Sequence, residues 1–168
     1  MRKLYNHIQI LDEAFNQPYR YNLKRINAFY YIGDFDLPDK GKVVMFIEGH
    51  EWSDTESAWS IKFQRHHPNR QHGSLGETGE GDAMRIFATV IAMIKEFIKK
   101  EKPQEINFAA HKPDWMVDLP HDHPKRSKEL TSREKLYKRL VKRYAGPMGY
   151  KFTTQTDNSA TDFRLVPK

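Results

Sequence analysis

The chain contains no cysteine among its 168 residues. Disulfide frameworks, thiolate zinc sites and cysteine nucleophiles are therefore excluded. Long apolar runs are also missing, because the longest stretch, residues 86–94, is interrupted by Thr89 and is far shorter than the ~20 residues that span a bilayer. No apolar segment follows the first basic residues, as a secretory signal requires. We therefore expect a cytoplasmic protein without a membrane anchor.

The composition is typical of a folded protein, with 38% hydrophobic and 30% charged residues. Internal repeats and a Pro- or Gly-rich linker are both missing, so we expect one domain over residues 1–168. Lys and Arg number 28 against 22 Asp and Glu, which gives a net charge of +6. This excess favours polyanionic partners such as nucleic acid, phosphorylated cofactors or acidic proteins.

Local patterns predict several strands. β-Branched and aromatic runs indicate strands at residues 28–32 and 42–48, with Gly33 closing the first and a turn at residues 37–41 between them. Strict alternation indicates a strand at residues 59–64. Short strands are also predicted at residues 105–110, 150–152 and 163–166, the last two joined by a polar turn region.

Apolar periodicity predicts two helices, and a mixed segment at residues 8–15 is also compatible with a helix. The longer of the two helices lies between Asp82, its predicted N-cap, and Pro103, which ends it, and it carries one apolar face. That face consists of Ala83, Ile86, Phe87, Val90, Ile91, Ile94, Phe97 and Ile98. The second helix begins near Thr131 or Ser132, has Glu134 in its first turn and ends at Gly146. We expect it to bury Leu136, Leu140 and Val141.

Glycines gather in residues 76–83, between a predicted strand and the long helix. Unpaired N–H groups and the positive dipole end of a helix attract anions, and glycine lets the backbone approach them closely. One interpretation is therefore a cradle for a pyrophosphate, and the other is a capped turn that enters a core helix. The segment is not a P-loop, because no lysine follows at the required position.

The order of these elements resembles the GNAT-type N-acetyltransferase superfamily, in particular its bacteriophage-encoded members. The resemblance covers about residues 58–168: a strand, the turn Gly79-Glu80-Gly81, the long helix, a strand, and a helix carrying Leu136-Tyr137 ahead of Gly149-Tyr150. It implies an α/β (α+β) fold, with a mixed, mostly antiparallel central sheet flanked by helices. It also implies an acyltransferase in the cytoplasm of an infected bacterial host.

In that family the turn binds the pyrophosphate of acetyl-CoA, and the cofactor lies in a splay between two central strands. Carried over to this chain, the resemblance implies that the cofactor-binding residues are Glu77, Thr78, Gly79, Glu80, Gly81 and Asp82. A tyrosine of the later helix protonates the departing thiolate in the family. Here that tyrosine would be Tyr137 or Tyr144, and the sequence does not choose between them.

Acetyl transfer to an amine needs a base, and Glu48 and His50 are the candidates because they follow the apolar run Val43 to Ile47, where the end of a strand would place them at a central cleft. The competing interpretation is a solvated junction between that strand and a loop. The His- and Asp-rich residues 111–123 do not predict a metal site, since His-x-His is a common accidental spacing and no third ligand stands at a regular position. The amine acceptor is not indicated.

Basic residues gather between residues 121 and 144, where nine of them stand against three acidic ones. Such a concentration on one helix and the segment before it predicts contact with a phosphate backbone. The residues expected to bind nucleic acid or a partner protein are Lys125, Arg126, Arg133, Lys138, Arg139, Lys142 and Arg143. Other interpretations are a solvated helix face or a site for the phosphates of coenzyme A. The alternative function is therefore a non-catalytic phage-type protein that binds nucleic acid or a host protein.

Overall fold

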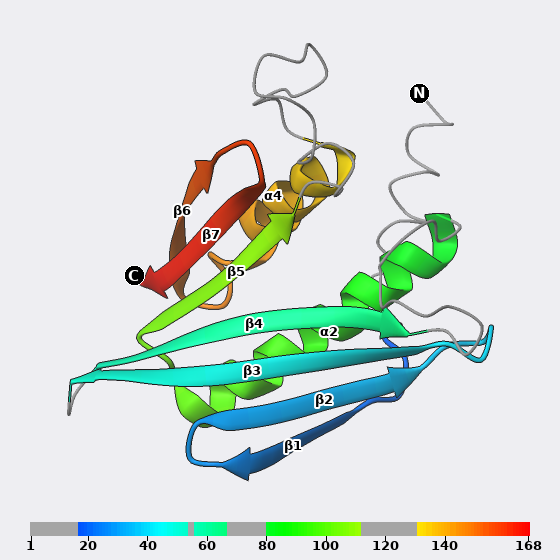
Figure 1. Cartoon of the computed structure of the whole chain (residues 1–168), viewed down its shortest axis with the longest axis horizontal. Coiled ribbons are helices and arrows are strands. Elements are labelled where there is room, and N and C mark those ends of the chain that lie inside the picture. The colour runs from blue at the N-terminus through cyan, green and yellow to red at the C-terminus, as the bar shows by residue number, and fades with distance from the viewer. Residues whose placement is uncertain (1–16, 54–55, 67–79, 112–130) are drawn as a thin grey trace. The chain divides into compact units, whose positions relative to one another are not determined.

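The computed structural model describes residues 17–53, 56–66, 80–111 and 131–168. These residues form β1 (Asn22–Asn27), β2 (Tyr30–Asp36), β3 (Lys42–Ser53), β4 (Glu56–His66), α2 (Glu80–Glu101), β5 (Glu105–His111), α4 (Ser132–Tyr144), β6 (Tyr150–Thr156) and β7 (Ala160–Pro167) (Figure 1). The strands make one sheet in the order β1-β2-β3-β4-β5-β7-β6. The sheet is mostly antiparallel, with β4 and β5 as a parallel pair. The predicted α+β class with a mixed sheet is confirmed.

Contacts divide the chain into two units. The first consists of Met1–Gly49 and Lys62–Lys102, and the second of His50–Ile61 and Pro103–Lys168. The first unit therefore holds β1, β2, α2 and most of β3, whereas the second holds β5, α4, β6 and β7. One domain over residues 1–168 stays a prediction.

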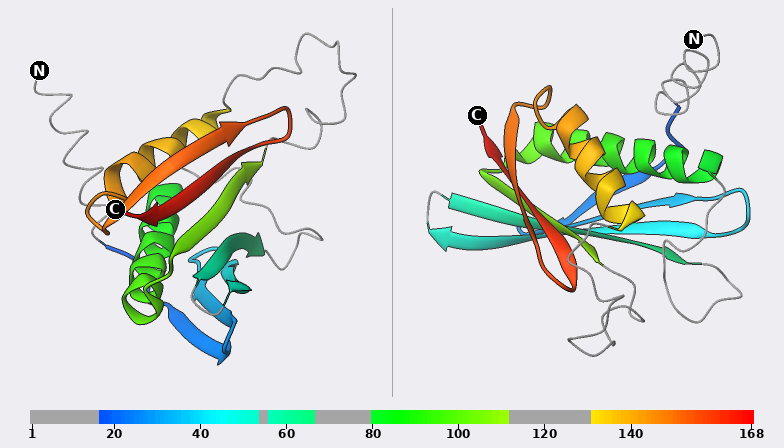
Figure 2. Two further views of the ribbon diagram at one scale, coloured as in Figure 1. Left: turned by 90° about the vertical axis from the view of Figure 1, so that its left-hand side faces the viewer. Right: turned by 90° about the horizontal axis from the view of Figure 1, so that it is seen from above.

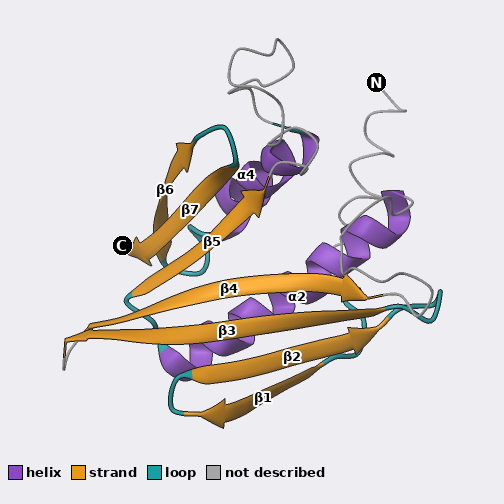
Figure 3. Ribbon diagram, viewed as in Figure 1, coloured by secondary structure: helices purple, strands orange, loops and turns teal. Residues whose placement is uncertain are grey.

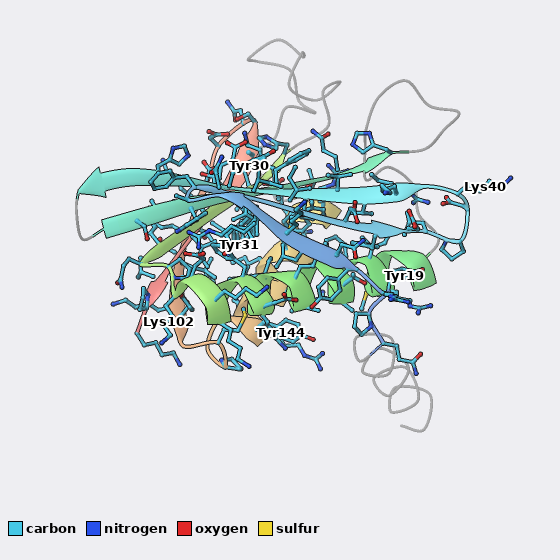
Figure 4. All side chains as sticks on the ribbon, turned by 90° about the horizontal axis from the view of Figure 1, so that it is seen from below. Tyr19, Tyr30, Tyr31, Lys40, Lys102 and Tyr144 are labelled. Carbon is cyan, nitrogen blue, oxygen red and sulfur yellow. The ribbon has the colours of Figure 1, made fainter. Side chains whose placement is uncertain are left out.

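In the first unit, α2 covers one face of the strands (Figure 2). The face of β3 beneath it carries buried Val43, Met45 and Ile47, which alternate with more exposed residues. Tyr31 of β2 points toward α2, where its ring meets Phe97 edge-on at 5.4 Å between centroids (Figure 4). The core of this unit therefore lies between α2 and one face of the sheet.

Two strand predictions are wrong in extent. β2 does not close at Gly33 but continues to Asp36, and β3 continues to Ser53 rather than ending at residue 48. A Cβ atom on Gly33 would lie 2.7 Å from the Sδ atom of buried Met93. Glycine therefore permits the helix to approach the strand here, instead of marking a turn. The edge strand β1 was not predicted, because its residues lack a buried alternating face.

The long helix is confirmed, with a shifted start and a shifted buried face. α2 begins at Glu80, so Asp82 stands in its first turn and the prediction of Asp82 as N-cap is wrong. The most deeply buried side chains are Ile86, Thr89, Met93 and Phe97, whereas Ile94 is half-buried. The helix ends where Pro103 follows Lys102, whose φ of 48° lies in the left-handed region.

In the second unit, α4 packs on β5 and β7 (Figure 3). The predicted start is confirmed, since Thr131 is the N-cap and forms a reciprocal capping box with Glu134. The buried positions are Glu134, Tyr137, Val141 and Ala145. Leu136 and Leu140 are only half-buried, so those two burial predictions are wrong. The buried face of α4 is therefore rotated about the helix axis relative to the predicted face, because Glu134 occupies a core-facing position.

β6 and β7 form a hairpin that is longer than predicted. The register runs from Tyr150 opposite Pro167 to Thr156 opposite Thr161. The turn shrinks to a few residues because the Asp157 carboxylate accepts hydrogen bonds from the backbone N–H groups of Ser159 at 2.6 Å and Ala160 at 2.9 Å. At the other end of the hairpin, the Tyr150 hydroxyl donates to the carbonyl of Pro103 at 2.7 Å.

Candidate functional site

Half of the predicted cofactor cradle lies in the first turn of α2. Glu77, Thr78 and Gly79 are outside the described residues, while Glu80, Gly81 and Asp82 open the helix. The first N–H groups of an α-helix have no acceptor within the helix, and the positive end of the helix dipole is located there. The chain thus presents backbone donors directly after Gly76 and Gly79, which is a donor set that suits a phosphate group.

The parallel pair is the second feature of the candidate site. Its register joins Ala58 to Glu105, Trp59 to Ile106 and Ser60 to Asn107. β4 continues from there to His66, and β5 to His111. The chain between the two strands contains the glycine segment and α2, so this is a strand–helix–strand connection with the predicted cradle at the entry to the helix.

The two candidate bases lie within β3, which continues to Ser53, so the prediction that they stand at the end of a strand is wrong. Glu48 stands opposite Tyr30 of β2, and both side chains are half-buried. Tyr30 points to the face of β2 away from α2 (Figure 4). His50 is exposed, and it lies two residues beyond Glu48 on the same face of the strand. Glu48 belongs to the first unit and His50 to the second.

The two candidate acids differ in their surroundings. Tyr137 is 6% exposed and lies in an aromatic cluster with Phe108 of β5 and Phe163 of β7. The centroid of its ring is 6.4 Å from the ring centroid of Phe108 and 6.4 Å from that of Phe163. Burial raises the pKa of the Tyr137 hydroxyl. Tyr144, in the last turn of α4, is half-buried, and the Arg143 guanidinium lies 5.6 Å from its ring centroid. The raised pKa keeps the Tyr137 hydroxyl protonated at neutral pH, and of the two tyrosines only Tyr137 is part of the core.

The basic residues predicted to bind a partner are mostly exposed on α4. Arg133, Arg139, Lys142 and Arg143 are exposed, and Lys138 is half-buried. Lys135, which the prediction omitted, is also exposed. Lys125 and Arg126 lie outside the described residues, as do all but His111 of the residues 111–123. In the described part of the chain, no cluster of three or more His, Asp or Glu side chains could hold a metal ion.

A cavity that the sequence did not reveal lies in the first unit. Its volume is about 530 Å³, and the lining residues are Tyr19, Arg20, Tyr21, Asn22, Asp34, Phe35, Asp36 and Lys42. Its polar groups bind one another, because Asp34 accepts a hydrogen bond from Asn22 at 3.1 Å and lies 3.5 Å from the Lys42 ammonium. Without a prediction of β1, no pattern could have placed these residues together.

Comparison with family models, with curated proteins and with solved structures finds no match for this chain. Within the described residues, no helix combines the length and the apolar character that crossing a bilayer requires.

Proposed function

We propose that the chain is an acetyl-CoA-dependent N-acetyltransferase of the GNAT type, acting on an amine acceptor. The observation that carries this proposal is the β4–β5 pair, parallel in a mostly antiparallel sheet and connected through the glycine segment and α2. Ligands of sheets with parallel strands characteristically bind beyond the carboxyl ends of those strands, and phosphates bind at the N-terminus of the following helix. The resemblance found in the sequence assigns the same segment to the cofactor.

The residues that would hold the cofactor are Glu77–Asp82, through backbone N–H groups. Bound acetyl-CoA would supply an activated thioester. Glu48 or His50 would take a proton from the acceptor amine, so that its nitrogen lone pair is free to attack the acetyl carbonyl carbon. As the carbon–sulfur bond breaks, Tyr137 or Tyr144 would donate its hydroxyl proton to the departing sulfur. The raised pKa of Tyr137 keeps that proton in place at neutral pH.

Cofactor binding is tested by calorimetric titration of acetyl-CoA into the purified chain and into a Gly79→Ala/Gly81→Ala variant. Added Cβ atoms would hold the backbone away from the pyrophosphate, so we expect affinity to fall about tenfold or more. Alanine suits a helix better than glycine, so α2 itself should not be weakened. Gly146→Ala is the matched control, because a Cβ there meets only the Lys168 Nζ atom at 3.5 Å.

Saturable binding to the parent chain and to Gly146→Ala, with loss in the double variant, supports the proposal. Absence of binding at millimolar acetyl-CoA rejects it and leaves the non-catalytic alternative. Equal affinity in all three proteins rejects the glycine segment as the cradle.

The proton donor is identified by Tyr137→Phe and Tyr144→Phe, assayed with acetyl-CoA and a panel of amines. Loss of a general acid lowers turnover by about 100- to 10,000-fold, while affinity for the cofactor should remain. Because Tyr137 is buried, the thermal unfolding midpoint of each variant is measured alongside. Unchanged turnover in both variants would exclude both tyrosines as the acid.

A further inference from the structure

The exposed surface of α4 carries a row of cations, and the described exposed positions of the helix include no acid. Lys135, Arg139 and Lys142 are exposed, and together with half-buried Lys138 they are spaced three or four residues apart. Residues at this spacing are neighbours on a helix surface. Among the residues that the structure describes, no salt bridge involves any of these four side chains. Below, this set of four is called the α4 cation row.

The single acid of α4 cannot neutralise that row. Glu134 is fully buried, and its carboxylate accepts hydrogen bonds from the Thr131 N–H at 2.9 Å and from the Thr161 hydroxyl. It is therefore committed to the helix N-terminus and to β7. Like charges four residues apart, such as Lys135 with Arg139, destabilise a helix by about 0.2–0.5 kcal/mol per pair. The row thus lowers the stability of α4, and no ion pair within the described residues compensates for this cost.

Cations elsewhere in the described chain are often arranged differently. Arg25 pairs with Glu101, Arg65 with Asp39, and Lys100 with Glu96. In the second unit, Arg164 of β7 pairs with Glu105 of β5 at 2.7 Å. The α4 cation row differs from these cations, because none of its four side chains has an ion pair among the described residues.

The faces of α4 determine which kind of anionic partner fits. A helix that binds a membrane surface needs a free apolar face, but the apolar residues Tyr137 and Val141 are buried in the protein. Protein–protein interfaces have an apolar or aromatic centre depleted of charge, whereas protein–nucleic acid interfaces are more polar and much more positively charged. The exposed positions of α4 that the structure describes are all basic.

We propose that the α4 cation row binds the phosphate backbone of nucleic acid. From Lys135 to Lys142 the helix advances ~10 Å, a distance over which duplex DNA presents roughly six phosphates. Binding through backbone phosphates is independent of base sequence and weakens steeply with salt. The row shares no residue with the cradle of the proposed acetyltransferase, so the two proposals fail in different experiments.

The test measures fluorescence anisotropy of labelled 20-base-pair DNA, of one of its single strands and of the matching RNA, at 50–200 mM salt. We compare the parent chain with Arg139→Gln/Lys142→Gln. Glutamine keeps the helix propensity, and the change removes like-charge contacts, so folding should be preserved. We expect affinity to fall roughly tenfold. The slope of log K against log[salt], which is negative, should become shallower by about two units. Lys151→Gln, an exposed lysine on β6, is the matched control and should leave both quantities unchanged.

Two further ligands separate the alternatives. Polyglutamate should compete poorly with DNA; competition at equal charge concentration would overturn the proposal in favour of an acidic protein partner. Titration with acetyl-CoA should give the same affinity for the parent and the double variant. A parallel loss of acetyl-CoA affinity would show that the row receives the phosphates of coenzyme A, and would also overturn the proposal. Absence of binding to all three nucleic acids at 50 mM salt would overturn it as well.

Discussion

The buried carboxylate of Glu134 gives the sharpest test of how the second unit is held together. Its side chain links the start of α4 to β7, since one oxygen accepts from Thr131 N–H and the other from the Thr161 hydroxyl. Thr161 is 1% exposed, and its Oγ1 lies 2.9 Å from Oγ1 of Thr156. A threonine hydroxyl has one proton to donate, so Thr161 donates to Glu134 and Thr156 donates to Thr161.

Thr161→Val keeps the shape of the side chain and removes this donor. Hydrogen bonds to a charged group contribute about 1.5–3 kcal/mol, and those between neutral groups about 0.5–1.5 kcal/mol. We therefore expect Thr161→Val to lower the free energy of unfolding by about 2 kcal/mol or more. Thr156→Val, which removes only the neutral bond, should lower it by about 1 kcal/mol.

Urea unfolding followed by circular dichroism measures both changes, provided that the m-value stays constant. A double-mutant cycle with Glu134→Gln isolates the contribution of the charge. With a neutral residue at 134, the effect of Thr161→Val should shrink to that of a neutral hydrogen bond. A Thr161→Val effect below about 0.5 kcal/mol, or one that Glu134→Gln leaves unchanged, would refute the reasoning.

Two other predictions concern the first unit and the end of α4. Burial and a hydrogen bond to Glu101 raise the pKa of Tyr31 to about 12, from an ordinary value near 10. Because the folded-state pKa is the higher one, this stabilisation is complete below about pH 10 and is lost as the pH rises toward 12. Urea midpoints between pH 8 and 11.5 should therefore fall less steeply for Tyr31→Phe than for the parent, and identical slopes for the two proteins would contradict this. Gly149 has a φ of 87°, and a Cβ atom added there would meet no heavy atom within 4 Å. Gly149→Ala should therefore lower the free energy of unfolding by about 1 kcal/mol through backbone strain alone. Gly146→Ala should cause no loss in the same urea assay.

Helix positions and the charge distribution were predictable from neighbouring residues alone. The apolar stripe of α2 and the Thr131–Glu134 capping box depend on spacings of three or four residues, which the backbone geometry converts directly into a shared face or a cap. The basic character of α4 is likewise visible in its composition. For the proposed site, the glycine segment and the candidate tyrosines could be named, but their surroundings could not.

The strands show where local patterns were insufficient. In the sequence, Gly33 predicts the end of a strand, yet it lies inside β2. A glycine stands there because Met93, sixty residues later, occupies the space that a side chain would need. β1 is an exposed edge strand, and its residues carry no buried alternation from which it could be detected. The sequence predicted Glu48 and His50 at a strand end, whereas β3 extends to Ser53.

The properties that follow from residue order alone are therefore local: the class of the fold, the helical stripes, the cap of α4 and the absence of thiol chemistry. Only the folded chain reveals the parallel pairing of β4 with β5, the burial of Tyr137 but not of Tyr144, and the hydrogen bond from the Thr161 hydroxyl to the Glu134 carboxylate. These depend on which distant segments meet, and a segment carries no record of its partner in its own periodicity. The exposed charge on α4 joins the two levels, since the sequence supplies the cations and the packing of the helix on β5 and β7 decides that they face water.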